Sequence, residues 1–398
     1  MGLALVRSRR RSESDFWVRY ERLHLLCLAI RDADRKELTV SWVPQTVTHV
    51  YASRSMDVAG HAIDIAESAY DLGVEATEWL PRLVESAGEL FDLGSGNIAM
   101  LGGGFRDDQQ GALSQMVTSD GKPDLAIALM SAVQEIGPEV IRRHTHNAMR
   151  SSVIEQLSAL RESEPRIYGI YTRHLGCKDV VSVHAHDPDG YGALFSMPCA
   201  EVVEPEPALK RTWERVAVHI ATAYRMRRRL DAAVASGGYA ATDLPLDAEA
   251  ILDPTSFSVK EAVGDAQTEK TAATIREAAL RVDRARGKLR RKDPDEALDL
   301  WKAMVRGRWS IVDWFDSDGR RFVLARPNAP NLGDPRGLTE REHQVVTYAS
   351  HGESSKLISY RLGISKQRVS KLLHDSMHKL GVKTTAQLVE KMRAFPSA

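Results

Sequence analysis

The chain is poor in the residues and segments that mark secreted, metal-binding or membrane proteins. Its 398 residues include three cysteines, Cys27, Cys177 and Cys199, which share no metal-ligand or Cys-x-x-Cys spacing and point to a reducing compartment. Such cysteines usually serve as small buried hydrophobic residues. No apolar run approaches the roughly 20 residues of a membrane-spanning helix. We therefore expect a cytoplasmic protein that makes no contact with a membrane.

Motifs of common enzymes are also missing. The sequence has no His-Glu-x-x-His, no Gly-x-Ser-x-Gly and no pattern of a cysteine with a histidine base. A glycine-rich stretch runs from Gly94 to Gly104, but it lacks the Gly-Lys-Ser/Thr of a phosphate-binding loop. We interpret its glycines as turns around a strand, and we expect no enzyme activity and no cofactor.

Two pairs of histidines need a separate explanation. His184 and His186 stand two apart on a predicted strand with Asp187 beside them, a spacing that could supply metal ligands. The solvent-facing side of a strand beside a turn is the commoner explanation. His144 and His146 lie near a predicted helix end and are poorly placed to share a metal. We expect no metal site.

The net charge is zero, but the charge is strongly segregated along the chain. Residues 56–267 carry −14 and residues 268–293 carry +5. The tail from Gly333 onward also carries +5, from eleven Lys/Arg against six Asp/Glu. An acidic body joined to a basic tail suits a regulator whose tail binds nucleic acid while its body does not.

The tail, residues 338–389, predicts four short helices with clear start and stop signals. Thr339 and Glu342 have the spacing of a capping box, which opens the first helix. Gly352, Gly363 and Gly381 follow the first three apolar stripes and end those helices. Four capped helices in this order favour a compact helical domain.

The second and third of these helices have the length and turn chemistry of a helix-turn-helix, with residues 362–365 as the turn. If the stripe that contains Val369 and Leu373 faces inward, the polar and basic residues of the third helix face solvent. These are the residue types that hold phosphates and read base edges. The candidate DNA-binding residues on the third helix are Lys366, Gln367, Arg368, Ser370, Lys371, His374 and Lys379.

This segment resembles the LuxR-type helix-turn-helix domain of bacterial transcription factors. The family's opening Leu-Thr-x-Arg-Glu stands at residues 338–342, and its Gly-x-Ser run with Lys-x-Ile at residues 352–358. The turn Leu-Gly-Ile-Ser is intact at residues 362–365, and the closing Lys-Leu-Gly-Val stands at residues 379–382. The resemblance covers about one sixth of the chain, and it implies binding to double-stranded DNA as a homodimer.

The departures from the family pattern fall on the surface that would contact DNA. The usual Thr-Val-Lys-x-His of the third helix is Arg-Val-Ser-Lys-Leu at residues 368–372. By position in the motif, the resemblance implies that Ser370, Lys371 and His374 face base edges. It also implies that four basic residues hold phosphates, namely Lys356 on the second helix and Lys366, Arg368 and Lys379 on the third. The half-site bound is therefore expected to differ from the one typical of the family.

Upstream of the tail, residues 56–233 predict one α+β domain. We predict helices at 62–70, 79–91, 125–136 and 153–160, strands at 97–101, 167–171, 180–186 and 191–197, and a closing helix from Trp213 through Tyr224. The last two strands flank Asp-Pro-Asp-Gly at 187–190, a strong hairpin turn. This order of elements resembles a GAF-type sensor domain.

Residues 245–328 predict a second, smaller unit. Two short strands within 248–263 precede a basic helix at 271–289 and a helix that opens at Pro294 and carries Trp301 and Val305. A hairpin with an Asp-Gly turn closes the unit at 309–326. The pattern resembles a PAS domain, with a linker helix and a lone hairpin as the alternative. Its basic helix offers a surface for dimer contacts.

Two segments show no persuasive pattern. Residues 1–55 form a basic extension that is either a flexible arm or a start assigned too early, and residues 329–335 are expected to be a linker.

The sequence therefore predicts a multidomain transcription regulator in which sensor regions control a C-terminal DNA-binding domain. Its expected partners are promoter DNA, a second copy of the chain, RNA polymerase and an unidentified small-molecule or protein signal. The alternatives are an adaptor whose helix-turn-helix no longer binds DNA and a sigma-factor region-four domain. The fourth helix argues against the sigma-factor domain.

Overall fold

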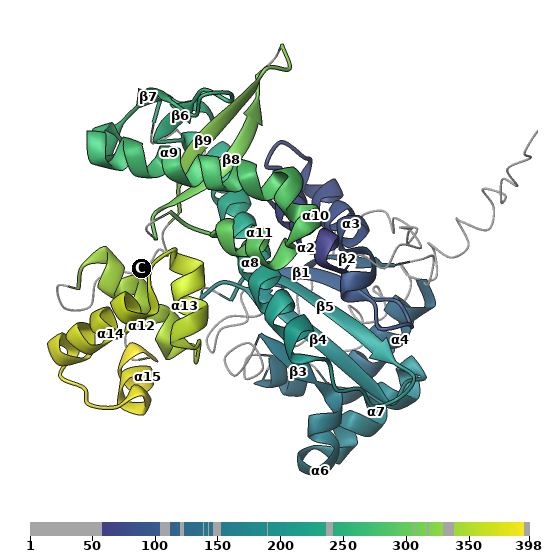
Figure 1. Ribbon diagram of the computed structural model, residues 1–398. Coiled ribbons are helices and arrows are strands. Elements are labelled where there is room, and N and C mark those ends of the chain that lie inside the picture. The colour runs from purple at the N-terminus through teal and green to yellow at the C-terminus, as the bar shows by residue number, and fades with distance from the viewer. Residues whose placement is uncertain are drawn as a thin grey trace, which may run out of the picture.

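The computed structural model describes residues 58–103, 112–119, 123–137, 139–141, 143–145, 153–188, 190–235, 242–305, 307–316, 318–328 and 338–393. They form two antiparallel sheets with their helices, followed by an all-helical C-terminal region (Figure 1). The predicted class, α+β upstream and all-α at the C-terminus, is confirmed. The predicted extension 1–55, the linker 329–335, Cys27, Gly104 and His146 lie outside the described residues.

The first sheet has five strands in the order β2-β1-β5-β4-β3, and all neighbouring strands are antiparallel. The strands are β2 Ala112–Thr118, β1 Ile98–Gly103, β5 Gly192–Cys199, β4 Asp179–His186 and β3 Ile154–Gln156. The predicted β4–β5 hairpin is confirmed, with His186 opposite Gly192. A Cβ on Gly192 would lie 2.0 Å from the carbonyl oxygen of Ala185, so only glycine fits at this close approach.

Three helices pack with this sheet in one core: α2 Val58–Ala69, α3 Ala76–Ala87 and α8 Pro207–Ala235. The indole nitrogen of Trp79 donates to the carbonyl of Ala69 at 3.0 Å, and that of Trp213 donates to the carbonyl of Leu90 at 2.7 Å. Both side chains are fully buried. Because each buried N–H has an acceptor, the two tryptophans add apolar contact without an unsatisfied donor.

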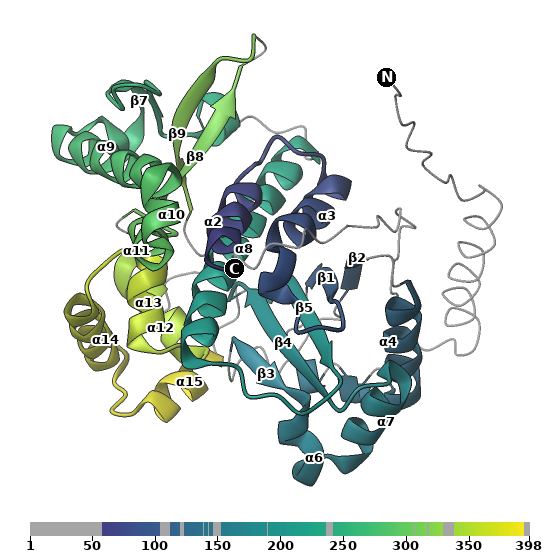
Figure 2. The ribbon, with the colours of Figure 1, turned by 45° about the vertical axis from the view of Figure 1, so that its right-hand side comes forward.

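Two predictions in the first unit are wrong. Residues 167–171, predicted as a strand, belong to helix α7 Pro165–Leu175, and residues 153–160, predicted as a helix, contain β3 and a 3-10 turn, Leu157–Ala159. In α7, Ile167 and Ile170 are one turn apart and pack on helix α4 Pro123–Ile136 (Figure 2). Pro165 in the first turn and Gly176, at φ 63°, bound this helix. Strand β2 was not predicted at all.

The second sheet has four antiparallel strands in the order β7-β6-β9-β8, namely Val259–Ala262, Ala250–Leu252, Arg321–Pro327 and Trp309–Phe315. The two short strands and the closing hairpin were predicted. Helix α9 Glu269–Arg284 follows β7 and buries Ile275, Ala279 and Val282. This apolar side is used within the chain, and the predicted dimer surface on this helix stays a prediction. The short α11 Pro294–Leu300 ends before Trp301 and Val305, which the sequence placed on it.

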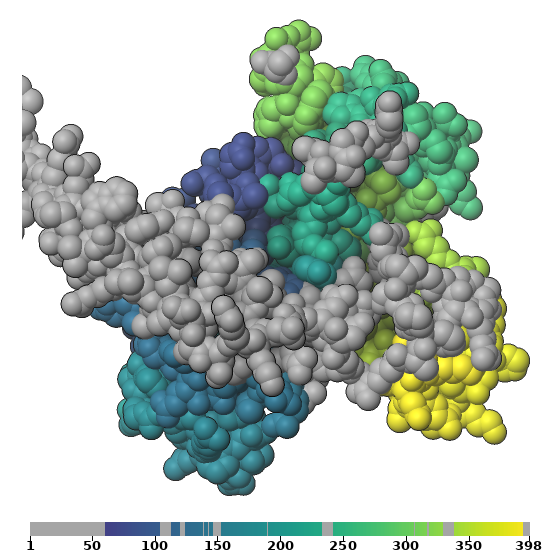
Figure 3. Space-filling model, turned by 180° about the vertical axis from the view of Figure 1, so that it is seen from behind, coloured from purple at the N-terminus to yellow at the C-terminus, as the bar shows by residue number. Residues whose placement is uncertain are grey.

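The two sheet regions share one hydrophobic core, which extends from Ala62 to Ala325. The 29 residues of α8 span about 43 Å at 1.5 Å per residue and run through the middle of the molecule (Figure 1). Seen from behind, the yellow C-terminal residues and the blue residues of the first sheet form separate lobes (Figure 3). The core joins residues before 233 to residues after 245. The boundary predicted there between the two sheet regions therefore stays a prediction.

Cys177 and Cys199 are buried and unpaired, as expected, and burial raises the pKa of each thiol to about 11. Within the described parts of the chain, none of the helices has the length and apolar character needed to cross a membrane.

Candidate nucleic-acid interface

Four helices make up the C-terminal domain: α12 Glu340–Ser350, α13 Ser355–Leu362, α14 Lys366–Leu380 and α15 Thr385–Arg393. The capping box is present, since the Thr339 side chain accepts from the Glu342 amide and the Glu342 carboxylate accepts from the Thr339 amide at 2.9 Å. Ser365 caps α14 by accepting from the Arg368 amide at 3.2 Å. Each cap satisfies an amide that has no partner within its own helix.

The turn between α13 and α14 positions the two helices of the helix-turn-helix. Gly363 and Gly381 end these helices in the left-handed conformation, at φ 64° and φ 66°. Val369 and Leu372 are buried in the core of the domain, and Leu373 packs against it partly buried. The predicted inward stripe of α14 is thus confirmed.

The opposite side of α14 faces solvent. The exposed residues at the candidate positions are Lys356, Lys366, Gln367, Arg368, Ser370, Lys371, His374 and Lys379. Seven of these eight lie on α14, and Lys356 lies on the first turn of α13. Among the residues that the structure describes, Lys366, Arg368 and Lys371 have no acidic partner within ion-pair distance. Unpaired cations on an exposed helix suit contact with phosphates.

Lys379 differs from the other candidates because it already has a partner. Its Nζ lies 2.7 Å from Oε2 of Glu342, whose side chain is nearly buried. Burial alone would raise the pKa of Glu342, but hydrogen bonds from Lys379 and Thr339 outweigh it and hold that pKa below its ordinary value. Lys379 therefore ties the end of α14 to the start of α12, and it would have to share its charge to bind a phosphate.

A comparison with protein families locates this domain in sequence. Residues 336–392 match the model of the bacterial regulatory proteins of the luxR family. These residues are a LuxR-type domain. The resemblance inferred from the motifs is thereby confirmed, and it covers all four helices. A search of curated proteins finds no match to the chain.

The LuxR-type domain docks on the upstream region through α13, while α14 lies on the outer side (Figure 1). The hydroxyl of Tyr360 on α13 lies 2.6 Å from Nε2 of His219 on α8, and 3.1 Å from the carbonyl oxygen of Leu298 on α11. Nδ1 of His219 lies 3.3 Å from the hydroxyl of Tyr70, next to the C-terminal end of α2. Met304, which follows α11, packs into the core of the LuxR-type domain.

These contacts form a continuous chain of hydrogen bonds if His219 is neutral. Burial, followed by the nearby charge of Lys302, lowers the pKa of His219 to about 3. The neutral ring can then donate from Nε2 to Tyr360 and accept at Nδ1 from Tyr70, while Tyr360 donates to Leu298. Nothing in the sequence pattern pointed to this docking site, because Tyr360 and His219 are 141 positions apart.

The glycine-rich stretch forms a turn, as interpreted, but the expectation that His184 lies on a solvent-facing side of its strand is wrong, because this residue is only 6% exposed. The Asp92 carboxylate accepts from the amides of Gly94 and Gly96, at 2.7 and 2.8 Å, so these glycines form a turn before β1. His184 Nε2 lies 3.3 Å from the Glu155 carboxylate. No group of three or more ligand-type side chains that could hold a metal occurs among the described residues.

Proposed function

We propose that the chain is a sequence-specific, DNA-binding regulator of transcription, in which the two upstream sheet regions control the LuxR-type domain. The observation that carries the proposal is the outer side of α14, where Lys366, Arg368 and Lys371 are exposed and unpaired in the described part of the chain. Ser370, Lys371 and His374 would face base edges. Lys356, Lys366 and Arg368 would hold phosphates, with Lys379 in a shared role.

The sensor role of the upstream region rests on its architecture. A five-stranded antiparallel sheet with helices α2, α3 and α8 and a four-stranded sheet with α9 support the GAF-like and PAS-like interpretations. Both regions meet the LuxR-type domain at Tyr360, since His219 belongs to α8 and Leu298 to α11. A signal that shifts α8 or α11 would therefore change the contacts of α13.

The docked arrangement leaves α14 uncovered, so we infer that docking orients the domain rather than blocks it. In a homodimer, two such domains would be held at a fixed separation, which suits half-sites about one helical turn apart. RNA polymerase is a further proposed partner at the promoter.

The test is a titration of the full chain against labelled promoter DNA at several salt concentrations. Lys371→Ala should cost about 1–3 kcal/mol on the preferred sequence and relax the preference at one base position. Arg368→Ala should weaken binding to all sequences and reduce the slope of log affinity against log salt by about 1. Arg161→Ala is the matched control, because Arg161 is exposed on α6 Leu160–Ser163, far from the LuxR-type domain.

The alternative function is an adaptor whose helix-turn-helix does not bind DNA, and the same titration tests it. If both α14 variants bound DNA as the parent chain does at every salt concentration, α14 would not contact DNA. The Ser370 position, where the family usually has lysine, would then be part of a surface that has lost DNA binding.

A further inference from the structure

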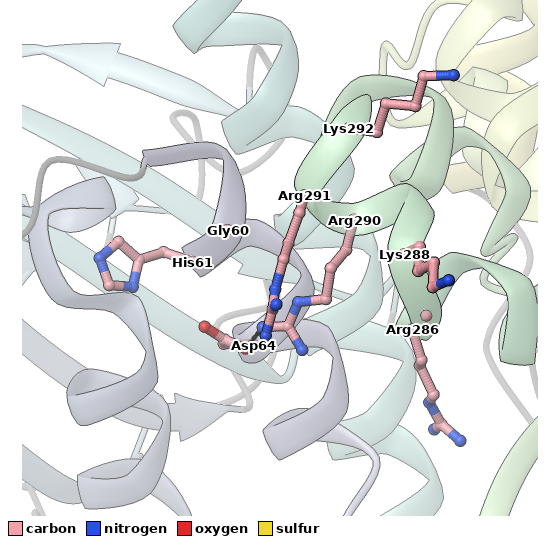
Figure 4. A pocket seen from close by; sticks show the side chains of 9 residues that line it. Gly60, His61, Asp64, Arg286, Lys288, Arg290, Arg291 and Lys292 are labelled. Atoms are coloured by element: carbon pink, nitrogen blue, oxygen red, sulfur yellow. Dashed lines mark hydrogen bonds and ion pairs between the residues drawn. The ribbon is translucent and has the colours of Figure 1, made fainter.

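A strongly basic pocket lies between α2 and the helical turns that follow α9 (Figure 4). Its volume is about 1010 Å³. Five cationic residues, Arg286, Lys288, Arg290, Arg291 and Lys292, line it, together with a single carboxylate, Asp64. We call it the α2–α10 pocket, since α10 Arg290–Lys292 supplies three of the cations.

The backbone brings these cations together by leaving regular helical geometry. After α9 the chain makes a five-residue π-helical turn, Ala285–Leu289, within which Gly287 departs from helical angles at φ −80° and ψ −142°. Such turns are rare, and they often occur at functional sites. The kink directs α10 toward α2, so that Arg290 and Arg291 lie side by side and reach toward Asp64 (Figure 4).

Two of the five cations are held in place by carboxylates. Arg286 pairs with Asp313 on β8 at 2.7 Å and with Glu67 on α2 at 3.3 Å, while Arg290 pairs with Asp64 and also lies 3.6 Å from Glu67. The two arginines therefore form a fixed wall across segments far apart in sequence.

The other three cations, Lys288, Arg291 and Lys292, are exposed and have no ion-pair partner among the described residues. In Figure 4 the side chains of Lys288 and Lys292 point away from Arg291, so each lysine would use its flexible stem to turn toward an anion bound at Arg291. Three unpaired cations within five residues that line one pocket supply the charge for a ligand with several negative charges.

We propose that the α2–α10 pocket binds a small polyanion that carries a chain of phosphates. The volume lies at the upper end of the range for small-molecule sites and suits a ligand of nucleotide size. DNA would instead need an open row of cations, as on α14. The phosphate chain is the shared chemistry of inorganic polyphosphates and of nucleoside triphosphates, so both are candidate ligands.

The pocket is also connected to the docked LuxR-type domain. The guanidinium of Arg286 lies 4.7 Å from the ring centroid of Trp301, and the carbonyl of Trp301 lies 3.3 Å from the Tyr360 hydroxyl. An anion bound at Lys288, Arg291 and Lys292 would shift the π-helical turn that carries Arg286, and with it the contact between Arg286 and Trp301. The pocket would then be an effector site. This effector role rests on the proposed function, but the binding of the anion is independent of it.

The first experiment measures binding of inorganic triphosphate to the full chain by titration calorimetry at low salt. The parent chain should bind about one triphosphate per chain. The triple variant Lys288→Gln, Arg291→Gln, Lys292→Gln should bind at least about tenfold more weakly. The matched control, Arg161→Gln, Arg166→Gln, Lys270→Gln, removes three exposed charges elsewhere and should bind as the parent does.

Several outcomes would overturn the ligand site. One is that the parent chain does not bind triphosphate, and another is that both triple variants bind it equally more weakly. A third is that the pocket variant loses affinity for DNA while none of the proteins binds triphosphate. The last outcome would make these cations a DNA contact. If the pocket variant failed to fold, Arg291→Gln alone should still show a weaker loss in the same direction. Adenosine and guanosine triphosphates distinguish the two ligand classes, since tighter binding than triphosphate shows that a base is also recognised.

The effector role has its own measurement. Saturating triphosphate should change the affinity of the parent chain for promoter DNA, beyond the change seen with the pocket variant at the same ionic strength. An equal change in both would overturn the effector role and leave the anion site standing. Failure of the chain to bind any DNA would contradict the proposed function, but not the triphosphate result.

Discussion

The Tyr360→Phe variant tests whether the LuxR-type domain is held against the upstream region. The change removes one hydroxyl and keeps the ring, so the packing of α13 is preserved. It deletes the 2.6 Å contact with His219 and the 3.1 Å contact with the carbonyl of Leu298. His219 is fully buried, and Tyr360 is 7% exposed. Water cannot easily replace the lost partner, so the expected cost is about 1–3 kcal/mol.

The chain offers a matched control in the same domain. Tyr348 on α12 is also buried, but its hydroxyl has no hydrogen-bond partner among the described residues. Tyr348→Phe should therefore be neutral or slightly stabilising, because it removes a buried polar group without breaking a bond. The two variants make the same chemical change and differ in whether the hydroxyl joins the two regions.

Hydrogen exchange of the α13 amides is the suitable assay, because it reports local opening separately from global unfolding. Tyr360→Phe should lower the free energy of opening at α13 by about 1–3 kcal/mol, and Tyr348→Phe should not. Since docking leaves α14 uncovered, loosening it should lower the affinity of the full chain for DNA by removing a fixed orientation. Equal exchange and equal DNA affinity in the two variants would refute the docking contact as a control point.

Three further predictions follow from charge and surface. Below the ordinary histidine pKa of 6.5, the unfolded chain binds a proton that folded His219 takes up only near its pKa of about 3, so stability is lost as pH falls from 6.5. His219→Gln should flatten this loss in urea titrations, by up to about 1.4 kcal/mol per pH unit. Glu342 contributes stability that is fully present above its ordinary pKa of 4.5 and is lost as pH falls through its lowered pKa. Lys379→Ala should weaken this dependence of stability on pH. The same variant should change the salt slope of DNA binding little. Light scattering on the DNA complex should show two chains per operator, and a footprint of one half-site with one chain bound would contradict the dimer.

The sequence was sufficient to predict helix ends where nearby residues supply the hydrogen bonds or the backbone conformation that a helix end needs. The capping box at Thr339 and the glycines at the ends of α13 and α14 all appear where predicted, because each depends on residues within one turn. The inward and outward sides of α14 follow from helical spacing alone.

Sequence patterns failed to predict the structure where contacts between residues far apart in the chain decide it. The isoleucines and tyrosines at 167–171 are residue types that favour strands, but burial of Ile167 and Ile170 against α4 makes the segment a helix. The docking of Tyr360 on His219 joins residues 141 positions apart, and a hydroxyl partner at that separation leaves no local pattern. The basic run at 284–292 was visible as charge, but only the kink at Gly287 and the approach of α2 turn it into a pocket.

The central claim is that the outer side of α14 contacts DNA, and one titration tests it most directly. The parent chain and the double variant Lys366→Ala, Arg368→Ala are titrated against labelled promoter DNA from about 50 to 200 mM salt, the range over which phosphate contacts dominate the change. The parent should lose affinity steeply with salt, and the double variant should bind more weakly with a slope shallower by about 2, one for each lost phosphate contact. Equal affinities and equal slopes for the two proteins would contradict the claim.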